Sequence, residues 1–216
     1  MILGRFIGRV LFRVCLGSTA VASTSAVETP MEETRFIDLR SVLSNTIEEG
    51  TRVKDPNRCE GVIGHHTATK AWSFKRVSDL HAFNQKWGII SYDKGVNWEG
   101  VIYLLKDPDI LGYHASGWNR DSFAIVMLGN FSEAEPTQAM INGFKLALRT
   151  TFDEYDLHYF TAHTRAKMNR QGLYTECPGT LNMEWIQKLE FDDRLYPSHI
   201  EGLPYDPEEE FRTIKK

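Results

Sequence analysis

The sequence predicts an α/β fold, in which a single domain holds a central mixed β-sheet flanked by helices. Short apolar runs typical of buried strands alternate with longer segments of helical periodicity over most of the chain. The 216 residues, of which 42% are hydrophobic, are enough for one domain with a proper core. We assign this domain to residues 31–190, preceded by a leader and linker (1–30) and followed by an acidic, proline-containing tail (191–216).

Four segments have the apolar content of core strands, namely 61–67, 101–105, 123–128 and 159–162. The first, GVIGHHT, is apolar until its last residues, which is typical of a buried strand that delivers polar side chains at its end. Glu99 and Gly100 come directly before the second strand and are typical of a hairpin turn. Strands of this kind separated by helices predict a sheet covered on both faces.

Four segments are expected to be helical, namely 36–47, 78–87, 136–155 and 181–189. The first has apolar residues at helical spacing. In the second, Ser78 is a candidate N-cap and Gly88 a stop signal. Pro136 is well placed in the first turn of the third helix. The apolar side of that helix carries Met140, Ile141, Phe144, Leu148 and Phe152.

The first 22 residues have two interpretations. Arg5, Arg9 and Arg13 precede a weakly apolar run that contains the cleavage-like pattern Ala20-Val21-Ala22, and this resembles a secretory signal peptide. The three arginines also share one face of a helix, so an amphipathic helix in contact with a membrane surface is the alternative. The first interpretation favours an exported protein, periplasmic or extracellular, or one associated with a virion or with lysis.

Composition excludes some classes of function. The formal net charge of -4 gives no indication of a nucleic-acid partner, and no run reaches the roughly 20 apolar residues of a membrane-spanning helix. The three cysteines, Cys15, Cys59 and Cys177, form no readable disulfide framework. We expect a monomer.

Three residues at the ends of predicted strands or in the loops that follow are candidate metal ligands: His65, His163 and Cys177. Imidazole and thiolate are good zinc ligands, and three protein ligands with one open position make a catalytic rather than a structural site. Each residue alone is a weak signal, because a single histidine is more often a core or surface residue. Their combination, with the sequence around each of them, is much stronger.

The local sequences occur in a fixed order and resemble one family. They are GHHTAT (64–69), Tyr92, HASGWNRDS (114–122), LGNF (128–131), AHT (162–164) and TECPG (175–179). Together they are similar to the type 2 N-acetylmuramoyl-L-alanine amidases, which include peptidoglycan recognition proteins and phage amidase lysozymes. The resemblance covers roughly 61–189 and implies the amidase and peptidoglycan recognition protein fold.

The resemblance implies a Zn2+ cofactor held by His65, His163 and Cys177. His66 is the open alternative to His65. Because neighbouring strand residues point to opposite faces, His66 is expected to pack or to form hydrogen bonds instead. The zinc of the family activates a water and polarises the amide carbonyl.

The resemblance also implies catalytic and substrate-binding residues. Tyr92 matches an active-site tyrosine that hydrogen-bonds the oxyanion or the attacking water. Thr175 matches a lysine or threonine that stabilises the same charge. The segment that contains His114, Trp118, Asn119 and Arg120 matches a substrate-groove loop.

The implied function is hydrolysis of the amide bond between N-acetylmuramic acid and L-alanine in peptidoglycan, in cell-wall lysis or turnover. A non-catalytic peptidoglycan-binding module is the alternative, and a structural protein that keeps the fold is a third possibility. Cys177 favours catalysis, because recognition members of the family lack the ligand cysteine.

Two segments depart from the family pattern. We expect 93–98 to be an edge or irregular strand, because it is polar where the family is apolar. We expect 165–174, which contains Arg165, Lys167 and Arg170, to be a basic loop. That loop is either a local patch for a stem-peptide carboxylate or simply solvated charge.

Overall fold

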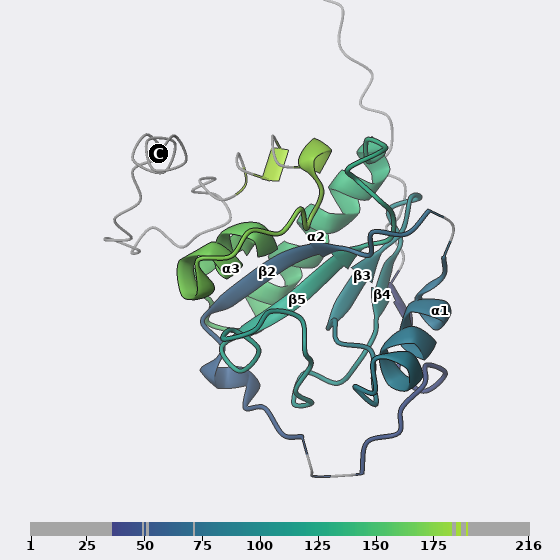
Figure 1. Cartoon of the computed structure of the whole chain (residues 1–216), viewed down its shortest axis with the longest axis vertical. Helices are drawn as coiled ribbons and strands as arrows, with labels where there is room; N and C mark the ends of the chain where they lie inside the picture. The colour runs from purple at the N-terminus through teal and green to yellow at the C-terminus, as the bar shows by residue number, and fades with distance from the viewer. Residues whose placement is uncertain are drawn as a thin grey trace, which may run out of the picture. The chain divides into compact units, whose positions relative to one another are not determined.

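The computed structural model describes residues 36–48, 50, 52–70, 72–182, 185–186 and 189, with the backbone alone for 168–170 (Figure 1). These residues all fall within the unit Glu33–Lys216. The predicted leader at 1–30, including Cys15, and the tail at 191–216 lie outside the described residues. Within the described part of the chain, no helix has the length and apolar character that crossing a membrane requires.

The centre of the domain is a six-stranded mixed sheet with the strand order β1-β4-β3-β5-β2-β6. Strands β2, β3, β5 and β6 are parallel to one another through their pairings, whereas β4 runs antiparallel to β3. The strands are β1 (Phe36–Asp38), β2 (Gly61–His66), β3 (Lys94–Val96), β4 (Ile102–Leu104), β5 (Ser122–Met127) and β6 (Tyr159–Ala162). The four predicted strands and the hairpin turn before β4 are therefore confirmed.

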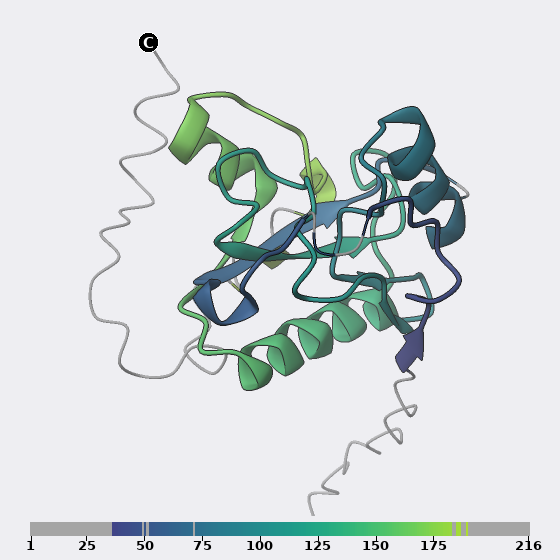
Figure 2. The same cartoon turned by 90° about the horizontal axis from the view of Figure 1, so that it is seen from below.

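Helix α2 (Gln138–Glu154) covers one face of the sheet, and α1 (Phe74–Asp79) and α3 (His163–Gln171) lie on the other (Figure 2). The predicted helix 136–155 is confirmed, although it begins two residues later. Thr137 caps it, because its side chain accepts a hydrogen bond from the backbone of Met140. The buried side of α2 includes Phe144 and packs in the same core as the β2 and β5 side chains facing it.

The prediction of a helix at 36–47 is wrong. Residues 36–38 form β1, which pairs in parallel with β4, and turns follow. The Asp38 carboxylate accepts hydrogen bonds from the backbone and the guanidinium of Arg40, and Leu39 donates its backbone N–H to Leu104. Pairing with the free edge of β4 thus overrides the helical spacing of the apolar residues.

The helix predicted at 78–87 begins earlier. Helix α1 starts at Phe74, because the Ser73 side chain caps it by accepting from the backbone of Arg76, and a π-helical segment, η2 (Leu80–Asn84), continues it. Ser78 is not a cap but a buried helical residue, whose hydroxyl donates to the carbonyl of Ser44. The predicted stop at Gly88 is wrong, because the helical segment already ends at Asn84 and Lys86 has a positive φ of 57°.

The helix predicted at 181–189 lies partly outside the described residues. Thr180–Asn182 forms a 3₁₀ turn, and residues 185, 186 and 189 are helical. Ile186 and Leu189 are buried in the core that α2 also lines.

Two further corrections concern the segments that depart from the family pattern. Strand β3 lies in the interior of the sheet between β4 and β5, not at its edge. The segment 165–174 is mostly helical, since it contains most of α3. Among the described side chains of α3 only Thr164 and Ala166 are buried, so its sequence carries too few apolar positions to show a helical period.

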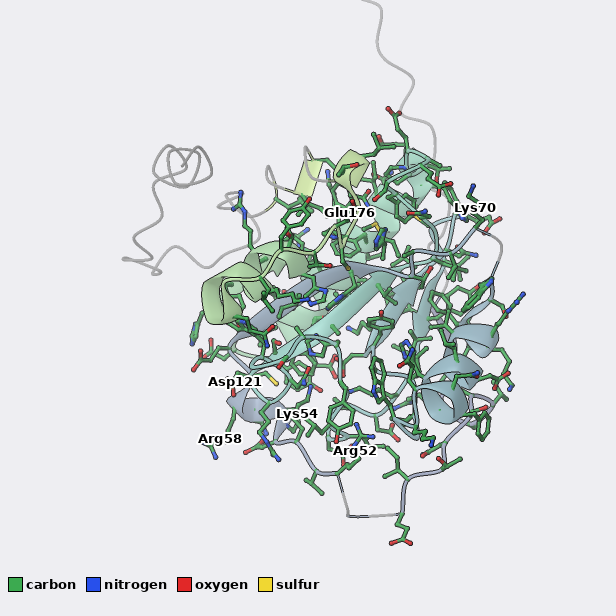
Figure 3. The ribbon with its side chains drawn as sticks, in the orientation of Figure 1. Arg52, Lys54, Arg58, Lys70, Asp121 and Glu176 are labelled. Atoms are coloured by element: carbon green, nitrogen blue, oxygen red, sulfur yellow. The ribbon has the colours of Figure 1, made fainter. Side chains whose placement is uncertain are left out.

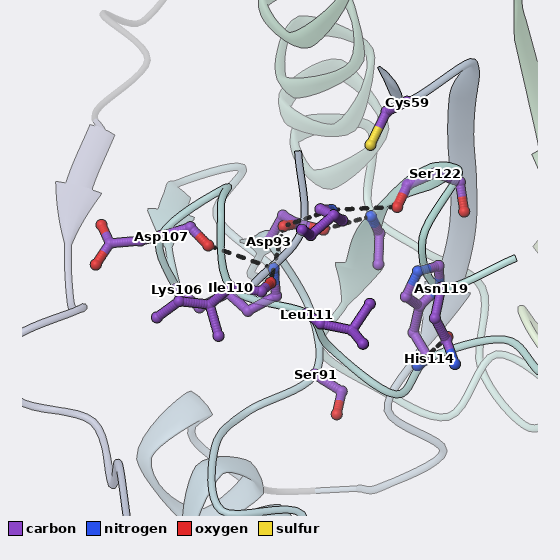
Figure 4. Close-up of polar contacts among 12 residues, drawn as sticks. Cys59, Ser91, Asp93, Lys106, Asp107, Ile110, Leu111, His114, Asn119 and Ser122 are labelled. Atoms are coloured by element: carbon purple, nitrogen blue, oxygen red, sulfur yellow. Dashed lines mark hydrogen bonds and ion pairs between the residues drawn. The ribbon is translucent and has the colours of Figure 1, made fainter. Parts of the chain in front are cut away.

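An interior strand that begins beside Asp93 is possible because the charge of Asp93 is paired inside the protein with Lys106 (Figure 4), while Lys94, the first residue of β3, pairs with the exposed Glu154. The Asp93 carboxylate receives the ammonium of Lys106, lies 3.7 Å from Nζ of Lys54, and accepts the backbone N–H of Ala124 at 2.7 Å. The side chains of Asp93, Lys54 and Lys106 are each at most 7% exposed. Burial opposes ionisation of Asp93, but the two ammonium groups outweigh it and lower the pKa of its carboxyl below 3.8.

We expect Asp93→Asn to lower the free energy of unfolding at pH 7 by about 3–5 kcal/mol, because it leaves two buried ammonium groups without a counter-charge. A carboxyl whose folded pKa is depressed stabilises the protein above its unfolded pKa, and this stabilisation is lost as the pH falls through the folded value. Urea unfolding at pH 7 and at about pH 3 should therefore show a smaller difference between wild type and variant in acid. The exposed Asp38→Asn is the matched control, and an equal loss in both variants would contradict the prediction.

Candidate metal centre

Three segments bring His65, His163 and Cys177 together. Within the described residues, one ligand atom from each side chain lies within 4.8 Å of the other two. His65 is near the end of β2, and His163 directly follows β6, the parallel neighbour of β2. Because parallel strands end at the same edge of a sheet, both histidines reach one place. Cys177 comes from the loop after α3.

Cys177 is held in position by the backbone around it. Its Sγ accepts the backbone N–H of His66 at 3.4 Å and lies 3.6 Å from Nδ1 of His65. Its carbonyl accepts the N–H of Thr164 at 2.9 Å. Gly179, two residues later, has a φ of 100°, and a Cβ there would lie 2.5 Å from the backbone carbon of Phe131. The turn of the TECPG sequence therefore requires glycine at this position.

His66 points away from this group. Its Nδ1 accepts the backbone N–H of Phe131 at 3.2 Å, and its ring is tilted against the Phe131 ring. Strand alternation explains the difference from His65, since the two side chains leave opposite faces of β2. Of the two histidines, only His65 is in the group with His163 and Cys177.

The electrostatics of the group suit a metal. Burial, with some help from His163, lowers the pKa of His65 well below 6.5, and burial lowers the pKa of His163 to about 4, so both rings carry a lone pair at neutral pH. Nδ1 of His163 is buried and has no hydrogen-bond partner among the described residues. Burial also raises the pKa of the Cys177 thiol to about 12, so a metal would have to displace its proton. Two neutral imidazoles and one thiol are a donor set that suits zinc.

The two predicted catalytic residues lie close to this group. The Tyr92 ring centroid is 5.3 Å from that of His65. Burial and the nearby Cys177 raise the pKa of Tyr92, so its hydroxyl stays protonated and able to donate. Thr175 accepts the backbone N–H of Cys177 at 3.4 Å through its hydroxyl oxygen, which leaves its hydrogen available for another acceptor.

The four predicted substrate-binding residues have different surroundings in the structure. His114 is buried, and its Nδ1 is 3.2 Å from Nε2 of His65. Trp118 instead donates its indole N–H to the carbonyl of Ala166 at 2.7 Å, and Asn119 accepts the backbone N–H groups of His114 and Ala115. Both side chains thus brace the loop itself.

Arg120 is exposed and lies away from the metal-ligand candidates. Its carbonyl accepts from the Cys59 thiol, and Cys59 precedes the start of β2. Its neighbour Asp121 lies at the opposite end of β2 and β5 from Glu176, the neighbour of Cys177 (Figure 3). The structure therefore does not bring Arg120 to the site. The loop begins at His114, beside His65 near the end of β2, and runs back to the start of β5 at Ser122.

One neighbouring residue is not evident from the sequence. His81, in η2, accepts the backbone N–H of Ser91 at 3.2 Å through Nδ1, and its ring centroid lies 5.4 Å from that of Tyr92. Burial lowers its pKa to about 4. In the sequence, His81 is only a histidine next to the inward-facing Leu80 of a predicted helix. That position does not indicate a contact with Tyr92.

A cavity of about 220 Å³ lies elsewhere, between α2 and strands β3, β4 and β5. None of the three ligand candidates lines it. Each charged side chain in its wall already has an ion-pair partner, as Lys106 has in Asp93 and Lys94 in Glu154. The cavity therefore presents no unpaired charge to a ligand.

A family model described as N-acetylmuramoyl-L-alanine amidase matches residues 55–180, which is more than half of the chain. The chain belongs to this amidase family. The matched range contains the three ligand candidates, Tyr92 and Thr175.

Relatives and solved structures agree with this assignment. Peptidoglycan-recognition protein SC2 of Drosophila melanogaster is 30% identical over 124 residues, which cover 54% of this chain and 66% of that protein. The amidase LysC of Clostridium intestinale URNW has the same fold, with a TM-score of 0.59 at 22% identity over 72% of this chain and 96% of LysC.

A second similar structure contains a ligand. Peptidoglycan recognition protein-LE, in complex with tracheal cytotoxin, a monomeric diaminopimelic acid-type peptidoglycan, has a TM-score of 0.60 at 23% identity, covering 71% of this chain and 92% of that one. The family thus includes proteins named as amidases and proteins named for recognition.

Proposed function

We propose that this member of the family is a zinc-dependent N-acetylmuramoyl-L-alanine amidase that cuts the amide bond between muramic acid and L-alanine in peptidoglycan. The observation that carries the proposal is the convergence of His65, His163 and Cys177. Two neutral imidazoles and one thiol at this spacing match the ligand number of catalytic zinc sites, which keep one coordination position open. A module that only binds peptidoglycan has no need for this set.

A bound zinc ion would supply a Lewis acid that activates water and polarises the scissile amide carbonyl. The protein's own groups then account for the rest of the chemistry. Tyr92, whose raised pKa keeps its hydroxyl protonated, donates a hydrogen bond to the oxygen on which negative charge develops. Thr175 offers a second hydroxyl donor, oriented by its contact with the backbone of Cys177.

The second candidate function is recognition of peptidoglycan without cleavage. A similar structure favours it, since peptidoglycan recognition protein-LE was solved in complex with a monomeric peptidoglycan. Proteins named for recognition and proteins named as amidases both match this chain at 30% identity or less. The choice between the two functions therefore depends on the site residues. Cys177 is the residue on which the choice rests.

Incubation with purified peptidoglycan tests the proposal. We expect the full chain to release stem peptides with a free N-terminal alanine, identified by mass spectrometry, and a chelator to stop the release until zinc is restored. Circular dichroism of the chelated protein controls for unfolding. Binding to peptidoglycan in a pull-down without release of peptides would instead identify a recognition module, and the absence of both would contradict either function.

A further inference from the structure

His65 and His114 share a contact that the metal centre by itself does not explain. Nε2 of His65 lies 3.2 Å from Nδ1 of His114, and the two rings meet edge to face at 88° with centroids 5.2 Å apart. Both side chains are buried, with exposed fractions of 1% and 9%. Two nitrogens at this distance form a hydrogen bond only if one of them carries a hydrogen.

The role of His65 as a metal ligand decides which nitrogen donates. Nδ1 of His65 faces Sγ of Cys177 at 3.6 Å, so this nitrogen must keep its lone pair if His65 is a ligand. The hydrogen of the neutral ring then sits on Nε2 and is donated to Nδ1 of His114. The reverse arrangement would place a hydrogen on Nδ1 of His65, where it would block coordination.

The loop around His114 is held in place through its backbone and through Trp118. The backbone N–H groups of His114 and Ala115 both donate to Oδ1 of Asn119, at 2.9 and 2.8 Å. The indole of Trp118 donates to the carbonyl of Ala166 on α3, and Ala115 packs with Ala166 and Ile63. The conformation that Asn119 and Trp118 impose therefore delivers an acceptor to His65.

We propose that His114 is a positioning residue that accepts the Nε2–H of His65 and thereby fixes this ring in the tautomer and orientation that present Nδ1 to a metal. The proposal rests on the proposed function only in taking His65 as a ligand. It reassigns His114 from substrate contact to the support of a ligand. Partners of this kind commonly change metal affinity by about 10–100-fold when they are removed.

Three substitutions of His114 test the acceptor. His114→Phe keeps the ring and removes the acceptor, so zinc affinity measured against a competing chromophoric chelator should fall by about 10–100-fold. His114→Asn places its side-chain oxygen where Nδ1 was and should retain affinity within about threefold, whereas His114→Gln reaches the position of Nε2 and should lose affinity as Phe does. His81→Phe, at a buried histidine that is no ligand candidate, is the matched control and should leave zinc affinity unchanged.

A second measurement covers the case in which His114→Phe fails to fold. Long-range ¹H–¹⁵N spectra of the wild-type chain without metal, at neutral pH, report the tautomer of each histidine. We expect the hydrogen of His65 on Nε2, and a hydrogen on Nδ1 would overturn the proposal. A loss of zinc affinity in His114→Asn as large as the loss in His114→Gln would also overturn the proposal. A chain that binds zinc with these preferences but leaves peptidoglycan intact would contradict the proposed function and not this inference.

Discussion

Cys177→Ser is expected to lower zinc affinity by more than about 10²-fold and to abolish amide hydrolysis. The loss of affinity should exceed the loss caused by changing a residue that only supports a ligand. The thiolate is the one anionic donor among the three candidates, and the serine hydroxyl does not ionise to replace it at neutral pH. Without a firmly held metal, no Lewis acid remains to activate water. Elemental analysis after dialysis and peptide release from peptidoglycan measure the two losses.

The chain offers a matched control for this change. Cys59 is buried and contacts the carbonyl of Arg120, away from the ligand candidates. Cys59→Ser should therefore keep one zinc per chain and normal peptide release, with at most a small loss of thermal stability. Wild-type zinc affinity in Cys177→Ser would contradict the assignment of Cys177 as a ligand.

Tyr92→Phe is expected to lower kcat by about 10²–10³-fold, or about 2.7–4 kcal/mol, with little change in KM. The substitution keeps the packing of the ring against His65 and deletes only the hydroxyl. That hydroxyl acts mainly once negative charge has formed on the former carbonyl oxygen, so its loss raises the barrier without weakening ground-state binding. Steady-state kinetics on a defined muropeptide measure the effect, and zinc content should stay the same.

Tyr155→Phe provides the control for Tyr92. Tyr155 follows α2, on the face of the sheet opposite the ligand candidates, and packs against Phe123. This variant should retain the wild-type kcat. If Tyr92→Phe also retains it, Tyr92 is a packing residue and the oxyanion donor is Thr175. If the wild type binds muropeptides and never cuts them, the chain is a recognition protein.

Patterns that are local in the chain were sufficient for the fold class and for much of the site. The apolar run that ends in His65 predicted β2, because a fully buried strand needs apolar side chains on both faces. The spacing of Met140, Phe144 and Leu148 predicted α2, because the buried side of a helix repeats every three to four residues. The alternation of side chains along a strand also separated His65 from His66.

Two of the features that the sequence missed depend on interactions between residues far apart in the chain. Strand β1 exists because β4 offers a free edge, and β3 is interior because Lys54 and Lys106 neutralise Asp93 from other segments. Neither partner can be inferred from the local composition of 36–47 or 93–98, which is why both segments were predicted wrongly.

The sequence by itself determined the α/β class, the family and the order of the candidate ligands, because these are carried by residue types at short spacing. Only the tertiary structure decided how the residues of the 114–120 segment divide. His114 reaches His65, Trp118 and Asn119 brace the loop, and Arg120 lies away from the site. The physical reason is that a hydrogen bond depends on where two side chains meet in space, and neighbours in an irregular loop follow no period that predicts their directions.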